Sequence, residues 1–110
     1  MKITLEQAMQ EGVVAHTDGK LEEAERIYRS ILQVKPNHGG ASHNLGLVAK
    51  SAGKINTAIK LFKTALEANP EVKQFWLSYI DALLEATQVQ NARRVIDQAK
   101  RHNFPQGELT

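Results

Sequence analysis

Residues 39–70 read GGASHNLGLVAKSAGKINTAIKLFKTALEANP. Apolar residues recur in this stretch at helical spacing, first before the turn Ala52-Gly53-Lys54 and again after it, from Ile55 to Ala65. Glycine in the turn permits the left-handed backbone that ends a helix, and Pro70 prevents the second helix from continuing. The stretch therefore predicts two helices joined by a short turn.

The same pattern occurs three times along the chain, with a period of 34 residues. The small residues Ala24, Ala58 and Ala92 keep this interval. The larger apolar residues on the same helices keep it too: Tyr28, Phe62 and Ile96. A fixed period of this size is typical of a solenoid, in which each unit buries its apolar face against the next. We expect one all-α domain over residues 1–110, with helix pairs in repeats 5–38, 39–72 and 73–106 and a tail at 107–110.

The composition is that of a soluble globular protein and excludes several functional classes. Charged residues make up 24% and hydrophobic residues 42% of the chain, and the net charge of +2 is too small to be typical of a nucleic-acid-binding protein. There is no cysteine, so disulfides and thiol nucleophiles are excluded. No run approaches the ~18 apolar residues of a membrane span. We expect a cytoplasmic protein without a membrane or nucleic-acid partner.

No arrangement of residues points to catalysis, a cofactor or a metal. The chain has four histidines, and none has a carboxylate or cysteine partner at metal-ligand spacing: His16, His38, His43 and His102. The glycines lie at helix crossings and turns and form no phosphate-binding loop. The basic residues of the last helix are interpreted as a solvated face. The sequence therefore favours a protein that is not an enzyme.

The second repeat resembles the tetratricopeptide repeat, whose signature combines Trp, Leu-Gly, Ala, Phe and Pro at fixed positions. The matching residues are Leu45, Gly46, Ala49, Gly53, Ala58, Phe62, Ala65 and Pro70. The first repeat departs from the signature at Glu11, and the third departs at Ile80, Thr87 and Pro105. The resemblance covers nearly the whole chain and implies a right-handed α-solenoid of three helix-turn-helix pairs.

The small residues of this signature have a packing role at the helix crossings. Two helices cross closely only where small side chains meet, which predicts contacts of Gly12 with Ala24 and of Gly46 with Ala58. At the third crossing Ile80 takes the place of glycine, so we expect that helix pair to lie slightly further apart.

The resemblance also implies a binding groove lined by the first helix of each pair. The groove positions of the family fall on Glu6, Met9, Val13, His16, Thr17, Gly40, His43, Leu47, Lys50, Ser51, Gln74, Leu77, Asp81, Leu84 and Glu85. This face is slightly acidic and partly apolar, which suits an extended peptide or an amphipathic helix as the partner. Two alternatives stay open: the residues form an ordinary mixed surface, or another part of the same polypeptide fills the groove.

One known use of such grooves is disfavoured. Members of the family that grip the C-terminal carboxylate of chaperones use Lys, Asn, Asn, Lys and Arg on this face. The corresponding positions here are Met9, Val13, Asn44, Gln74 and Ser78, of which only Asn44 fits. The cations are missing, so we do not expect this chain to bind chaperone tails.

The C-terminal end of the stack raises a second hypothesis. Residues 103–110 are too short to form a capping helix, which predicts a partly open apolar face. Its members are Leu83, Val95, Ile96 and Ala99. Three outcomes stay open: the native chain continues, two copies pack end to end as a homodimer or scaffold through the C-terminal repeat, or the face is tolerated.

A looser resemblance concerns residues 74–84, which are similar to repeats in long bacterial proteins. In those proteins such repeats precede a glycosyltransferase, sulfotransferase or methyltransferase domain. The resemblance implies an alternative function, in which the chain is the N-terminal substrate-recognition domain of a larger transferase.

Overall fold

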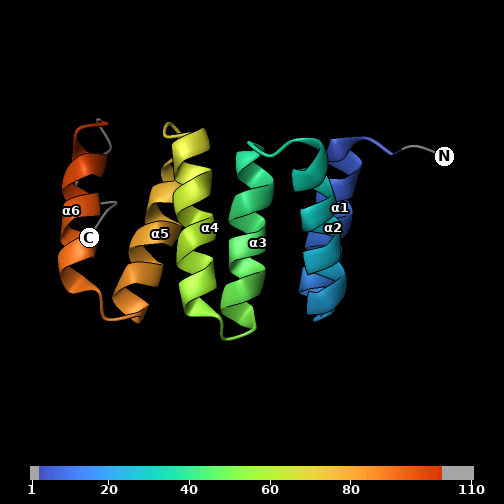
Figure 1. Ribbon diagram of the computed structural model, residues 1–110, viewed down its shortest axis with the longest axis horizontal. Helices are drawn as coiled ribbons and strands as arrows, with labels where there is room; N and C mark the ends of the chain where they lie inside the picture. The colour runs from blue at the N-terminus through green and yellow to red at the C-terminus, as the bar shows by residue number, and fades with distance from the viewer. Residues whose placement is uncertain (1–2, 103–110) are drawn as a thin grey trace.

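The computed structural model describes residues 3–102 and contains six α-helices within them. They are α1 (Leu5–Thr17), α2 (Leu21–Val34), α3 (Gly39–Ser51), α4 (Ile55–Ala68), α5 (Lys73–Glu85) and α6 (Val89–Lys100). No strand occurs in this range. The helices stand side by side along an axis of 45 Å, with α1 and α2 at one end and α6 at the other (Figure 1). The all-α solenoid predicted from the 34-residue period is confirmed.

The turns within the pairs follow the predicted chemistry, with one exception. Gly19 and Gly53 adopt φ angles of 79° and 78°, the left-handed backbone that glycine accepts readily. At the equivalent place in the third pair, Thr87 adopts a φ of 60°. A β-branched residue is strained in this region, so the third turn has the same shape at a higher energetic cost.

Each of the first two pairs is closed by a glycine that lies against an aromatic ring. A Cβ atom built on Gly12 would lie 2.6 Å from the ring of Tyr28, and one built on Gly46 would lie 2.5 Å from the ring of Phe62. Ala24 and Ala58, on the facing helices, have no exposed surface. The helices of the first two pairs therefore approach closely at the predicted glycines, but the atoms nearest to a Cβ built there belong to the aromatic ring and not to Ala24 or Ala58.

The third pair is built differently. Here Ile80 and Ile96 occupy the places of the glycine and the aromatic residue, so the volume at the crossing is shared between two aliphatic side chains. Helices α5 and α6 pack less closely than the helices of the first two pairs. The wider third crossing predicted from Ile80 is therefore confirmed.

The helices form two rows with different spacing. Neighbouring members of the row α1, α3, α5 are joined directly by side-chain contacts: His16 to Ser51, His43 to Ser78, and Lys50 to Glu85. The members of the row α2, α4, α6 are instead separated by hollows of about 350 Å³ and 560 Å³. Closer spacing on one side bends the stack, so α1, α3 and α5 form its inner row. The sites below are built on this row.

Candidate functional site

The structure brings the predicted groove residues together on the inner row. Val13 and Leu84 are exposed apolar side chains, with 48% and 47% of their surfaces accessible. Met9, Leu47 and Leu77 are half-buried and pack into the core along one edge. The remaining polar members differ in exposure: Lys50, Gln74 and Asp81 are exposed, and His16 and Asn44 are half-buried. The row therefore presents apolar side chains from all three repeats, interrupted by polar groups.

His43 is the exception, because it is not available at the surface. Only 7% of it is accessible, and its ring stacks on Phe75 at 4.8 Å and lies tilted against Phe62 at 5.4 Å. The expectation that His43 lines the groove is wrong. The preceding and following repeats pack around α3, and a flat ring at this position fills the space between two aromatic side chains.

The polar atoms of His43 belong to a chain of hydrogen bonds that runs through all three repeats. The Gln74 side-chain amide donates to the Ser78 hydroxyl at 3.3 Å, and Ser78 lies 2.7 Å from His43 Nε2. His43 Nδ1 lies 3.2 Å from Asn44 Oδ1, and Asn44 Nδ2 donates to the Tyr28 hydroxyl at 3.3 Å. Every contact is satisfied when each group donates to the next, from α5 through α3 to α2. This direction requires a neutral His43 that carries its proton on Nδ1.

Burial shifts two titratable groups in this chain toward their neutral forms. Desolvation lowers the pKa of His43, against a smaller opposing effect of its hydrogen bond to Asn44. Desolvation likewise raises the pKa of Tyr28, again opposed by its hydrogen bond to Asn44. Both shifts favour the neutral groups that the hydrogen-bonded chain requires. The chain is therefore intact at neutral pH and joins the repeats without placing a charge between them.

Two exposed contacts join the other end of the inner row. His16 Nε2 lies 2.9 Å from the Ser51 hydroxyl, and Lys50 Nζ lies 3.8 Å from a Glu85 carboxylate oxygen. The ion pair is exposed and therefore contributes little to stability. It nevertheless directs the cation of Lys50 toward the neighbouring helix.

The sequence contained a signal for these bridges that the groove positions alone did not use. The partners His16–Ser51, His43–Ser78 and Lys50–Glu85 are each 35 residues apart, one more than the repeat period. A helix residue thus meets the residue one position further along in the next inner helix. Searching for polar partners at this spacing would have identified Ser78 as the partner that buries His43.

The predicted self-association face is not open. Leu83, Val95 and Ala99 are 1%, 6% and 0% exposed, so the expectation that they are partly open is wrong. They pack into the cluster that contains Phe75 and Trp76, because α5 and α6 cover one another's apolar sides. Only Ile96 of this group is half-buried. The residues 103–110, which were expected to be too short for a cap, lie outside the described range.

Neither a metal centre nor a membrane span occurs in the part of the chain that the structure describes. No three His, Cys, Asp or Glu side chains within residues 3–102 gather in a group that could hold a metal ion. No helix in that range has the length and apolar character needed to cross a bilayer.

Comparison with known proteins places this geometry in a family. A family model described as tetratricopeptide repeat matches residues 43–108, which is more than half of the chain. A comparison with curated protein sequences gives no match.

Three solved structures illustrate the likeness of fold. The type III secretion chaperone SycD of Yersinia enterocolitica, in complex with a peptide of the translocator YopD, has a TM-score of 0.81 and 18% identity, over 93% of this chain and 78% of that one. The TPR2B domain of yeast Sti1, in a complex with pHsp70, has a TM-score of 0.81 and 18% identity, over 90% and 79%. An O-GlcNAc transferase of Thermobaculum terrenum has a TM-score of 0.79 and 21% identity, over 93% of this chain but 20% of that one. These identities establish a shared fold, and together with the matching family model they show that the chain belongs to the tetratricopeptide repeat family.

Proposed function

We propose that this chain is a non-catalytic protein-interaction module that binds a peptide or an amphipathic helix along its inner row. The observation that carries the proposal is the exposure of apolar side chains on a surface whose helices are joined to one another. Val13 on α1 and Leu84 on α5 lie in different repeats, and Leu47 on α3 lies between them in sequence. Exposed apolar side chains on a bridged face are typical of a peptide-binding groove.

The bridges between the inner helices support this function physically. Binding is stronger when the site is held in its binding shape beforehand, because less conformational entropy is then lost on association. The buried contact between His43 and Ser78 and the exposed contact between His16 and Ser51 hold α1, α3 and α5 at fixed distances. Most of the conformational entropy lost on binding is therefore lost by the partner and not by this chain.

The chemistry of the row favours an apolar ligand surface over a carboxylate. Asn44, Gln74 and Ser78 are already hydrogen-bonded within the chain. Met9 and Val13 are apolar. Carboxylate recognition needs charged donors that point at the ligand, and these positions provide none. We infer that the groove takes the apolar side chains of a partner and not its C-terminal carboxylate.

Solved relatives of the fold agree with a binding role. The SycD structure contains a peptide of YopD, and the Sti1 domain was solved in a complex with pHsp70. Both likenesses rest on low sequence identity, so they support the class of function and not the partner. The proposal assigns to this chain a protein partner, no membrane or nucleic-acid partner, and a cytoplasmic location.

The proposal is tested with a peptide selected by display against the folded chain. Val13→Asp and Leu84→Asp each place a charge on the inner row and should weaken binding of that peptide at least about tenfold. The matched control is Val34→Asp, because Val34 is 74% exposed and lies on α2 in the outer row. Calorimetric titration that shows equal losses for all three variants, or no loss for Val13→Asp and Leu84→Asp, would refute the proposal.

A second candidate is the recognition domain of a larger transferase. This chain aligns with 20% of the matched O-GlcNAc transferase, which is a longer protein. In that case the same inner row would present an acceptor polypeptide to a catalytic domain. The mass of the native gene product distinguishes the two: about 12.2 kDa fits a free-standing module, and a much larger mass fits the transferase.

A further inference from the structure

Within residues 3–102, no helix covers the outward ridge of α6, whereas α5 covers the same ridge of α4. This ridge consists of Val89, Arg93, Ile96 and Lys100, which are spaced to lie on one side of the helix. The residues 34 positions earlier are Ile55, Ile59, Phe62 and Leu66 of α4, and they pack against α5. On α6 the ridge is open, with Val89 46% exposed and Ile96 half-buried.

At the opposite end of the molecule, one face of α1 is exposed. The outward face of α1 consists of Gln7, Gln10, Glu11 and Val14, and Asp18 follows the end of the helix. The residues 34 positions after the first four are Ala41, Asn44, Leu45 and Val48 of α3, which face the preceding helix α2. No helix precedes α1 in the described residues, and Val14 is 59% exposed.

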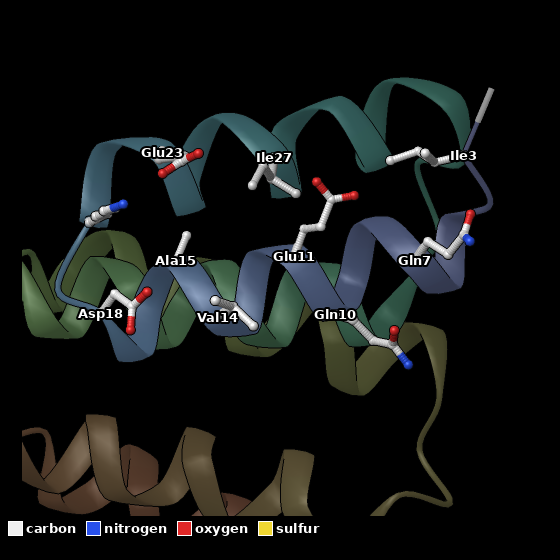
Figure 2. A pocket seen from close by; sticks show the side chains of 10 residues that line it. Ile3, Gln7, Gln10, Glu11, Val14, Ala15, Asp18, Glu23 and Ile27 are labelled. Carbon is white, nitrogen blue, oxygen red and sulfur yellow. The ribbon is translucent and has the colours of Figure 1, made fainter. Parts of the chain in front are cut away.

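Figure 2 shows this end of the stack at close range. A hollow of about 530 Å³ lies along α1 and α2, and the Glu11 side chain points between the two helices toward Ile27. Glu23 and Asp18 add carboxylates at one end of the hollow. The recess therefore combines apolar side chains with three carboxylates and one cation, Lys20.

The contacts between α2 and α3 show how the two open surfaces would meet. Leu21, Glu25, Leu45 and Val48 line one hollow between these helices, and the Tyr28 hydroxyl accepts a hydrogen bond from Asn44. Adding two repeat periods to the number of an α2 residue gives the equivalent residue of α6. Subtracting one period from the number of an α3 residue gives the equivalent residue of α1. The register of α2 against α3 therefore predicts the register of α6 against α1. The transfer places Ile96 against Gln10, and it places Val89 and Arg93 around one hollow with Glu11 and Val14.

The charges of the two ends are opposite. Residues 3–34 carry six acidic and three basic side chains, whereas residues 73–102 carry five basic and three acidic ones. On the ridge of α6 the change is local, because Arg93 and Lys100 occupy the places of Ile59 and Leu66. On α1, Glu11 occupies the place of Leu45. Opposite charges across an interface attract and set its register.

We propose that a second copy of this chain stacks head to tail on the first, with its α1 against α6 as α3 lies against α2. The partner of each surface is a different surface, so the association is open-ended and produces growing chains of copies. A symmetric pairing of α6 with α6 is disfavoured, because Arg93 and Lys100 would then face a surface of their own charge. The stack continues the solenoid from one molecule into the next and extends the inner row.

The first test is sedimentation velocity of the chain across a wide concentration range. Head-to-tail stacking predicts a sedimentation coefficient that rises continuously with concentration and falls when the salt concentration is raised from about 0.05 to 0.5 M, because salt screens the charges. A chain that stays monomeric at millimolar concentration, or a single dimer that does not grow further, overturns the proposal.

The second test reverses the charges at the proposed contact. Arg93→Glu alone and Glu11→Arg alone each place like charges opposite one another and should weaken association at least about tenfold. The double variant Arg93→Glu/Glu11→Arg restores opposite charges and should recover most of the association. Lys60→Glu is the matched control, since this exposed residue of α4 lies at neither end.

Circular dichroism of each variant keeps this test independent of folding, because all three residues are exposed. Failure of the double variant to recover, with helicity unchanged, contradicts the pairing of Arg93 with Glu11. A loss with Arg93→Glu but none with Glu11→Arg identifies a symmetric contact of α6 and overturns the head-to-tail arrangement. Equal loss with Lys60→Glu shows a nonspecific charge effect and overturns it as well.

Discussion

Single residues determine where the repeats depart from one another. Thr87 adopts the left-handed backbone that glycine provides in the other two turns, at a φ of 60°. Its hydroxyl donates to the Ala86 carbonyl at 2.6 Å, a local contact that accompanies the turn. The turn therefore keeps its shape because the helices on both sides impose it, and the residue bears the strain.

Replacing this threonine with glycine should stabilise the chain. Thr87→Gly removes the left-handed strain, and we expect the free energy of unfolding to rise by about 1 kcal/mol. The reciprocal variant Gly53→Thr introduces the same strain into the second turn and should lower the free energy of unfolding by about 1 kcal/mol. Urea denaturation of both variants checks the pair. A lower stability for Thr87→Gly would show that the threonine is favourable in this turn.

Protonation of a single histidine should also be visible in the stability of the whole chain. The folded pKa of His43 lies below its unfolded value, so the unfolded chain takes up the proton first as the pH falls. The stabilisation from neutral His43 is fully present above about pH 6.5 and is lost as the pH falls from there toward the folded pKa.

The measurement is urea denaturation of the chain and of His43→Gln at pH 7.5 and pH 5. The glutamine variant cannot take up this proton, so the native chain should lose more stability between the two pH values than the variant does. The carboxylates titrate in both proteins and cancel in the comparison. Equal losses of stability would show that the pKa of His43 is the same in the folded and the unfolded chain.

At the scale of the elements, the fit between helices decides how tightly each pair closes. In the second pair, Phe62 fills the space that Gly46 leaves, and α3 and α4 lie close together. In the third pair two isoleucines share that space, and α5 and α6 lie further apart. The closeness of a pair is thus a property of two facing positions and not of the helices as a whole.

A methyl group added at the second crossing should be destabilising. A Cβ at residue 46 would overlap the ring of Phe62, so Gly46→Ala should lower the free energy of unfolding by about 1–2 kcal/mol, despite the better helix propensity of alanine. Gly40→Ala on the same helix is the control. Its Cβ would lie 3.3 Å from the end of the flexible Met9 side chain and from the His38 ring, which need to shift by only a few tenths of an ångström, so its stability should not fall. Thermal unfolding that shows equal effects at both sites would contradict the crossing argument.

At the scale of the whole molecule, the repeat period predicted the fold, and the contacts between repeats determined the site. The spacing of Ala24, Ala58 and Ala92 is periodic, and together with the helical apolar periodicity within each repeat it was sufficient to predict six helices and their order. The burial of His43 could not be deduced from its groove position, because it depends on Phe75 and Ser78 in the next repeat. The position of a residue in its repeat determines the helix face on which it lies, whereas contacts with the neighbouring repeat determine whether its side chain is exposed.

At the ends of the stack, too, the contacts between helices determine which residues are exposed. The expectation of an open apolar face at Val95 and Ala99 treated the last pair as a copy of the others that lacked a successor. In the structure Val95 and Ala99 turn inward, and the positions that would meet a following repeat are Val89, Arg93, Ile96 and Lys100, two of which are charged. Comparing each terminal position with its counterpart one period away would have indicated this change of chemistry.

The central claim is that the inner row of α1, α3 and α5 is the binding surface. The most direct test maps the amide chemical-shift changes that a display-selected peptide causes in the isotope-labelled chain. We expect the largest chemical-shift changes around Val13, Leu47 and Leu84 on the inner row. Changes concentrated on α2, α4 and α6, with the inner row unaffected, would contradict it.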